Sequence, residues 1–136
     1  MEPCELTMTD AARELRSRSL SPVELTASVL QRVAAVEGEL NAFTTVFADR
    51  AREQARSAED EMARGQFRGP LHGIPVAVKD LYNMAGVATT ASSKVQANHL
   101  AKDDSTCVKL LADAGAVMIG KTQLHEFAYG VITSPR

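Results

Sequence analysis

The chain has 136 residues, of which 45% are hydrophobic and 24% are charged. These fractions are ordinary for a globular protein and exclude a disordered or low-complexity chain. The net charge is -2 and basic residues are scattered among acids, so direct nucleic-acid binding is disfavoured. No apolar run reaches the roughly 18 residues of a membrane span. Met1 is followed by Glu2 and Pro3 rather than by a basic and apolar leader, so we expect a cytoplasmic protein.

Two helices are predicted at the start of the chain. Thr9 is placed as the N-cap of a short helix that runs to about Ser17. Ser21-Pro22-Val23-Glu24 combines a cap, a proline in the first turn and a capping-box glutamate, which predicts a second helix. We expect that helix to end near Glu37, with Gly38 in the left-handed position that closes it.

Residues 41–46 favour a short extended segment or strand. From about Ala48 to Arg64 the charged residues alternate in sign at helical spacing, which is typical of a helix with one solvated face. Gly65 is predicted to end that helix.

The stretch from Gly69 to Asp80 reads G-P-L-H-G-I-P-V-A-V-K-D. Its apolar residues do not alternate with polar ones, which is typical of a strand covered on both faces. Lys79 ends this strand, and ligands of open α/β sheets bind beyond the carboxyl ends of the strands. A sheltered lysine can serve as a base because burial favours the neutral amine. The alternatives are a structural lysine that caps the strand and pairs with Asp80, and a lysine that is simply exposed.

A hydroxyl-rich loop at residues 89–93 could line an active site, although such hydroxyls are more often loop and cap groups.

Asp103 or Asp104 is predicted to cap a helix that Gly115 closes, and a second buried strand follows at 116–119. The strand, helix and strand predict a crossover with parallel strands. Gly115 to Thr122 has the spacing of a phosphate-binding loop, but the four residues before Gly120 are those of the predicted strand and leave no loop, so phosphate binding is not predicted.

Neither the cysteines nor the histidines suggest a metal site. Cys4 and Cys107 are far apart and share no C-x-x-C spacing, and His72, His99 and His125 have no close spacing. We predict reduced thiols, no metal and no cofactor.

The stretch from Gly69 to Asp80 resembles the start of the amidase signature family, whose members cleave or transfer across amide C–N bonds with a Ser-cisSer-Lys triad. Ser92 stands where the family usually has glycine. The resemblance continues in order through Val87 to Thr90, Ser93-Lys94, Asp104-Ser105-Thr106, Ala114-Gly115-Ala116, Gly120-Lys121-Thr122 and Glu126-Phe127-Ala128.

The resemblance implies an α/β fold in which N-terminal helices pack on a mixed sheet, the N-terminal fragment of the family's α/β/α sandwich. Residues 1–136 are then the first part of a single domain, with a helical prefix at 1–66 and the start of the catalytic sheet at 67–136. By position in the motif Lys79 is the catalytic lysine, and Lys121 is taken as structural. The serine-rich stretch that supplies both serines is not in this sequence, so we expect this chain alone to be inactive.

The resemblance leaves the substrate and the partners open. A complete protein is expected to hydrolyse a small-molecule amide, and the substrate-binding residues stay unknown. The alternatives are an A-subunit-like glutaminase of a tRNA-dependent amidotransferase and a non-catalytic remnant that serves as an interaction module. A Schiff-base enzyme would also use Lys79. We expect either a homodimer or amidotransferase partner subunits.

Overall fold

A three-stranded mixed sheet forms the centre of the molecule. The computed structural model describes residues 2–131 and 133, so the ends of the predicted domain, Met1 and 134–136, lie outside the described residues. Strand β1 (Phe43–Val46) is antiparallel to β3 (Val117–Thr122), and β2 (Pro75–Lys79) is parallel to β3 on its other side. The predicted mixed sheet and parallel crossover are confirmed, and the last strand continues beyond the predicted range of 116–119.

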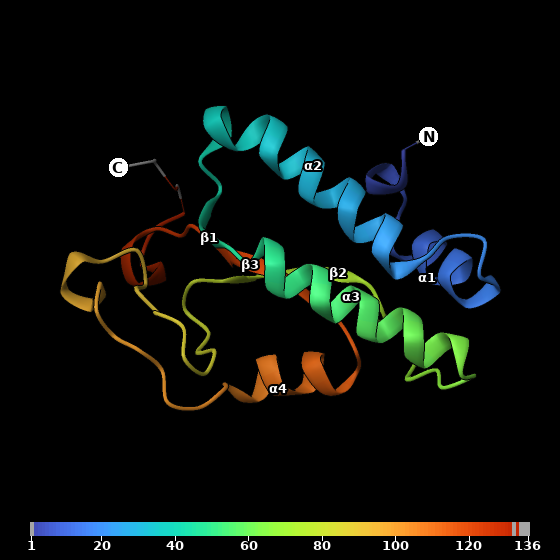
Figure 1. Ribbon diagram of the computed structural model, residues 1–136. Coiled ribbons are helices and arrows are strands. Elements are labelled where there is room, and N and C mark those ends of the chain that lie inside the picture. The colour runs from blue at the N-terminus through green and yellow to red at the C-terminus, as the bar shows by residue number, and fades with distance from the viewer. Residues whose placement is uncertain (1, 132, 134–136) are drawn as a thin grey trace.

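Helices lie on both faces of the sheet. In Figure 1, α2 (Pro22–Leu40) and α3 (Ala48–Ala63) run along one face, and α4 (Thr106–Asp113) lies on the other. Helix α1 (Met8–Ser17) packs near the start of α2. Three short 3-10 helices complete the described elements, namely η1 (Pro3–Glu5), η2 (Lys94–Gln96) and η3 (Glu126–Ala128).

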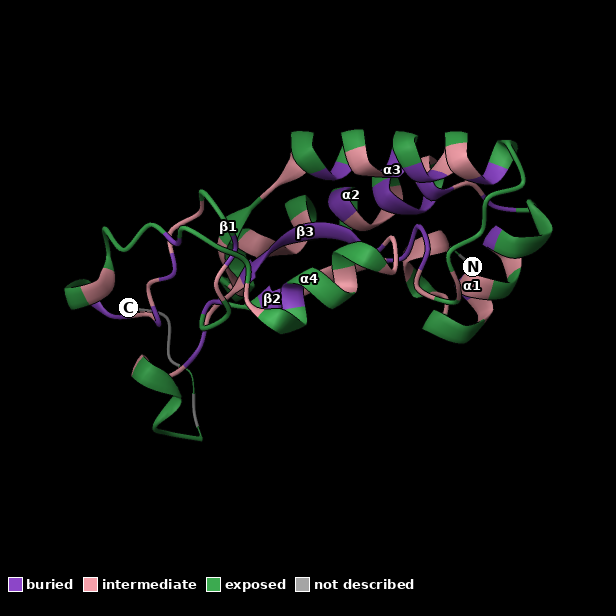
Figure 2. Cartoon of the chain, turned by 90° about the horizontal axis from the view of Figure 1, so that it is seen from below, coloured by how far each residue is buried: buried purple, intermediate pink, exposed green. Residues whose placement is uncertain are grey.

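The core has a layer on each side of β3. One layer contains Leu30 of α2 and Ala51 and Ala55 of α3, which pack on Val117 and Ile119. The other layer joins Met118 and Val78 to Val108 of α4. Figure 2 shows β3 buried between these layers and α3 with its buried residues turned inward. Burial of each valine, leucine, isoleucine or methionine side chain in these layers stabilises the fold by about 1.5–3 kcal/mol.

Two predicted helix caps are wrong by two residues or less, and the reason in both cases is a competing hydroxyl. The α1 cap is Thr7, whose Oγ1 accepts a hydrogen bond from the Asp10 amide at 3.1 Å. The α4 cap is Ser105 rather than Asp103 or Asp104. Asp104 instead accepts a hydrogen bond from the Ala85 amide at 2.7 Å and so ties the preceding loop to the start of α4.

The predicted end of α2 is also wrong. Gly38 continues the helix to Leu40, and Asn41 takes the left-handed position with φ 46°. Asparagine is the residue other than glycine that adopts this conformation most readily. The predicted capping box at Ser21 and Glu24 is confirmed.

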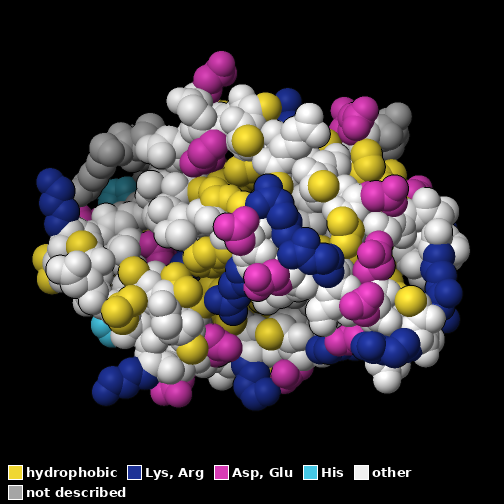
Figure 3. Space-filling view, viewed as in Figure 1, with side chains coloured by type: hydrophobic (Ala, Val, Ile, Leu, Met, Phe, Trp, Pro, Cys, Tyr) yellow, Lys and Arg dark blue, Asp and Glu magenta, His cyan; other side chains and the backbone are white. Residues whose placement is uncertain are grey.

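Exposed acidic and basic side chains are intermixed on the face formed by α2 and α3. Figure 3 shows acidic and basic groups interspersed there, and Arg52 and Asp49 of α3 form a surface ion pair at 2.9 Å. This face therefore carries no continuous basic stripe. Within residues 2–131 and 133, no helix is both long and apolar enough to cross a bilayer.

His72 lies at the amino ends of β2 and β3, where it links α3 to the segments that precede the two strands. Its Nδ1 accepts a hydrogen bond from the Arg68 amide at 3.2 Å, and its Nε2 lies 3.2 Å from Oε2 of Glu61 in α3. The ring also fills the space beside Gly115, where an added Cβ would come within 2.5 Å of Cδ2. Burial lowers the pKa of His72, and this effect outweighs the opposing influence of the Glu61 carboxylate.

We expect the stability of the protein to fall as the pH drops below about 6.5, because the unfolded chain binds a proton at His72 that the folded chain resists. The stability contributed by neutral His72 is fully present above that pH. It is lost as the pH falls towards the lower pKa that His72 has in the folded chain. Glu61 does not interfere in this window, since its hydrogen bond to Arg68 lowers its pKa from 4.5. Chemical denaturation at pH 7 and pH 5 should show that the free energy of unfolding falls less between these pH values in His72→Gln than in the wild type. Equal losses in both proteins would contradict this expectation.

Candidate active site

Lys79 lies at the carboxyl end of β2 with a fixed backbone and an exposed side chain. It is the register partner of Thr122 in β3, and the next amide, that of Asp80, donates to the Thr122 carbonyl at 2.9 Å. The Lys79 carbonyl accepts from the amides of Leu81 and Tyr82 at 2.7 and 3.0 Å. No hydrogen bond or ion pair engages the Lys79 amine within the described part of the chain. Backbone hydrogen bonds thus hold the end of the strand in place, while the Lys79 amine has no polar partner among the described residues.

The sequence predicts a sheltered amine, and within this chain that expectation is not met. Val78 points into the layer beneath α4, so Lys79 points to the opposite face because successive strand residues alternate. None of the described elements covers it there, and its side chain is exposed.

The charged pair at the strand ends joins Asp80 to Lys121, not to Lys79. Lys121 is completely buried, and its Nζ lies 2.8 Å from Oδ1 of Asp80. The same ammonium donates to the Ala88 carbonyl at 2.9 Å and to Thr89 Oγ1 at 2.7 Å, which uses all three of its donors. The alternative in which Asp80 pairs with Lys79 is therefore wrong.

A break in the strand register explains why the pattern of residues could not identify this pair. Val76 lies beside Met118 but Ala77 lies beside Gly120, so Ile119 is an extra residue in β3. Simple alternation from Met118 would direct Lys121 to the other face of the sheet. The bulge instead places Lys121 beside Val78, on the face to which Asp80 also points.

The hydroxyl-rich loop is anchored to the same strand ends. The second Asp80 oxygen accepts from Thr90 Oγ1 at 2.5 Å. Ser92, in the family's glycine position, has φ 53°, a left-handed conformation that strains a residue with a Cβ. Its hydroxyl donates to Gln123 at 3.0 Å, and the Ser93 hydroxyl donates to Glu126 at 2.6 Å. These contacts support the interpretation of Ser92 and Ser93 as loop-bracing groups.

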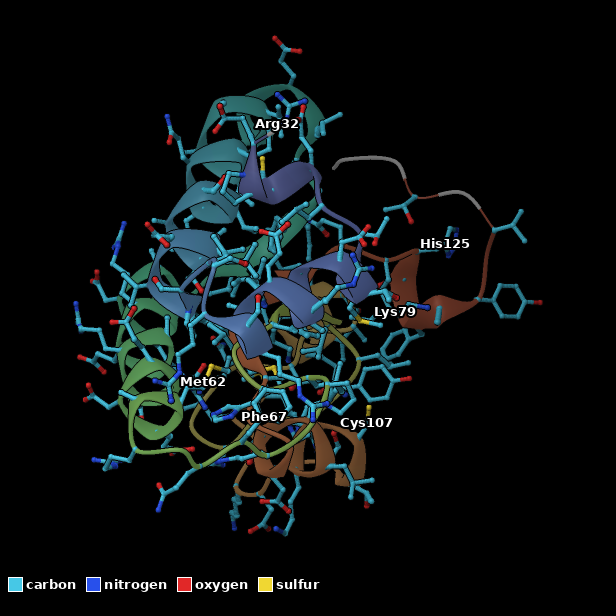
Figure 4. All side chains as sticks on the ribbon, turned by 90° about the vertical axis from the view of Figure 1, so that its right-hand side faces the viewer. Arg32, Met62, Phe67, Lys79, Cys107 and His125 are labelled. Atoms are coloured by element: carbon cyan, nitrogen blue, oxygen red, sulfur yellow. The ribbon has the colours of Figure 1, made fainter. Side chains whose placement is uncertain are left out.

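A cavity of about 890 Å³ opens next to this loop. Its walls come from the loop, the start of β1 and the region of η3, and include Thr90, Ser92, Ser93, Gln123, His125 and Glu126. Figure 4 shows Lys79 and His125 on the same side of the molecule, away from Met62 and Phe67. Thr90 connects the cavity to Asp80, whereas Lys79 does not line it.

The histidines and cysteines do not converge on this site. His72 is buried at the amino ends of β2 and β3, His99 is exposed, and His125 is the histidine that borders the cavity. No cluster of three or more His, Cys, Asp or Glu suited to a metal occurs in the ranges 2–131 and 133.

The fold and these strand ends place the chain among the α/β proteins whose ligand sites lie at the carboxyl ends of parallel strands. Comparison with known proteins defines the family. A family model described as Amidase matches residues 24–136. The chain belongs to this amidase family, as its resemblance predicts.

Individual relatives agree with this assignment. The chain is 48% identical over 129 residues to an amidase of Pseudomonas putida, an alignment that covers 94% of this chain and 27% of the relative. It is 43% identical over 129 residues to the A subunit of the glutamyl-tRNA(Gln) amidotransferase from Anaeromyxobacter dehalogenans strain 2CP-C, an alignment that covers 95% of this chain and 26% of that subunit. The solved structure of the native peptide amidase of Stenotrophomonas maltophilia matches this chain with a TM-score of 0.84 and 38% identity. The match covers 92% of this chain and 26% of the peptide amidase. The chain thus spans about a quarter of the length of these relatives.

Proposed function

We propose that a complete protein containing this chain hydrolyses carboxamide C–N bonds and that Lys79 is its catalytic base. The observation that carries the proposal is the free amine of Lys79 on a rigid strand end, in a chain that belongs to the amidase family. In the mechanism that the family resemblance implies, a second serine passes the proton of the nucleophilic serine to the neutral Lys79 amine. The same amine then returns a proton to the departing nitrogen.

We further propose that residues 1–136 are the first part of a single catalytic domain. The helical prefix at 1–66 packs on the sheet that begins within residues 67–136. Because both serines are expected from other parts of the domain, this chain alone should be inactive. A Lys79 exposed within this chain fits the proposal, since the remaining parts of the domain would cover it.

Ammonia release from a panel of linear carboxamides tests the proposal. The complete protein should release ammonia, and residues 1–136 alone should not. A chimera in which this chain replaces the matching region of the Pseudomonas putida amidase provides a second host for the assay. A folded complete protein that releases no ammonia from any amide would contradict the proposal, as would equal activity of the isolated chain.

A second candidate function is that of the glutaminase component of an amidotransferase. Several relatives are, by name, A subunits of glutamyl-tRNA(Gln) amidotransferases. In that case the complete protein should co-purify with partner subunits, and glutamine hydrolysis should increase when partner and tRNA are added. Hydrolysis of simple amides by a monomer or homodimer would instead favour the first candidate.

The non-catalytic interaction module is a further alternative. It predicts no amide hydrolysis by the wild-type protein and no effect of substituting Lys79 on that result. The two enzymatic candidates both require the opposite result.

A further inference from the structure

The buried pair of Asp80 and Lys121 takes no part in the proton transfers proposed above. A buried ammonium is tolerated where its charge is balanced and its donors are satisfied. Lys121 meets both conditions, with one carboxylate and two neutral oxygens around it. Asp80 is equally well satisfied, because Thr90 occupies its second oxygen.

The pair is connected directly to the backbone of Lys79. Asp80 is the next residue, and its amide donates to the Thr122 carbonyl at 2.9 Å. Its carbonyl accepts from the Ala91 amide at 2.9 Å, so the strand end and the hydroxyl-rich loop share one anchor. Any change in the pair therefore acts on both the position and the charge environment of Lys79.

We propose that Lys121 is a positioning residue for Lys79: it binds the Asp80 carboxylate on the far face of the sheet and so keeps the strand end fixed and the neighbouring amine free of a compensating anion. This inference rests on the base role of Lys79 proposed above. A base must lose its proton easily, and an unbalanced carboxylate nearby would oppose that loss. Lys121 cancels the charge of that carboxylate.

Other titratable groups lie on the segments that follow β2 and on α4, and none of the described ones forms a hydrogen bond or ion pair with the Lys79 amine. They come from the turn after β2, the loop and η3, and α4 adds a thiol and an ion pair on its exposed side. These groups are Tyr82, Lys94, His125, Glu126, Cys107 and the pair of Lys109 with Asp113. They stay unchanged when only the buried pair is altered, so the comparison isolates that pair.

Single substitutions should shift the pH profile of kcat/KM in opposite directions. Lys121→Met leaves the Asp80 charge unbalanced and should move the acid limb to higher pH by about 0.5–1 unit. Asp80→Asn leaves the Lys121 charge unbalanced and should move it to lower pH by about as much. The double variant restores neutrality and should return the midpoint close to the wild-type value. A purely structural role would lower the rate without opposite shifts.

Competitive acetylation of Lys79, followed by mass spectrometry across pH, measures the same titration in proteins with no activity. It therefore separates failure of this inference from failure of the proposed function, which Lys79→Ala tests by activity. If Lys121→Met does not fold, the near-isosteric Asp80→Asn decides the sign alone. Shifts in the same direction, or no shift in either folded variant, would overturn the inference.

The exposed pair of Lys109 and Asp113 on α4 provides a matched control. Its atoms are 2.7 Å apart, but both side chains are more than 60% exposed. Lys109→Met and Asp113→Asn make the same charge changes in solvent, where salt screens them. Neither should move the midpoint, and shifts as large as those of the buried pair would also overturn the inference.

Discussion

Replacement of Lys79 by alanine should lower kcat/KM for amide hydrolysis in the complete protein by about 10²–10⁴-fold, the usual contribution of a general base. The physical reason is that the nucleophilic hydroxyl loses the group that takes its proton. Steady-state ammonia release measures the effect. Because the Lys79 side chain is exposed and forms no hydrogen bond or ion pair with another described residue, the stability of the fold should hardly change.

Lys102 is the matched control for this experiment. It is an exposed lysine in the loop before α4 and does not border the cavity. Lys102→Ala removes the same charge and should leave kcat/KM within about twofold of the wild type, since it lies outside the proposed proton path. Near-wild-type hydrolysis by Lys79→Ala would remove the role assigned to Lys79.

Gly120→Ala should destabilise the protein by about 1–3 kcal/mol, the usual cost of overpacking a core. A Cβ at this position would lie 2.5 Å from the Thr45 carbonyl oxygen and 2.7 Å from the Phe43 ring. The carbonyl belongs to the neighbouring strand and cannot move without breaking the β1–β3 pairing. Denaturant unfolding of the complete protein measures the effect.

Gly38 supplies a control of opposite sign. It lies within α2, is exposed, and has no atom within 4 Å of an added Cβ. Gly38→Ala should stabilise the helix by about 0.5–1 kcal/mol. Equal effects of the two substitutions would contradict the packing assigned to Gly120.

Local signals in the sequence predicted most of the fold. The capping box at Ser21 and the apolar runs before Lys79 and Lys121 identified α2, β2 and β3, because each signal depends on residues close together in the chain. The caps failed where two hydroxyl or carboxylate groups competed, as at Ser105 and Asp104. Such competition is decided by contacts with distant segments.

The buried pair at the strand ends could not be predicted in the same way. Lys121 meets Asp80 because a bulge at Ile119 changes the face to which Lys121 points. A bulge depends on strand pairing and leaves no periodic signal in either strand. The place of Lys79 at the end of a strand followed from an apolar run, whereas its exposure depends on what covers the strand end.

Lys79→Arg tests the central claim most directly. Arginine keeps the positive charge at the strand end but does not release its proton in proteins. If a neutral amine accepts the proton, kcat/KM for amide hydrolysis should fall as far in Lys79→Arg as in Lys79→Ala. Activity of the arginine variant within about tenfold of the wild type, well short of the loss expected for a missing general base, would show that a fixed cation is sufficient and would contradict the account.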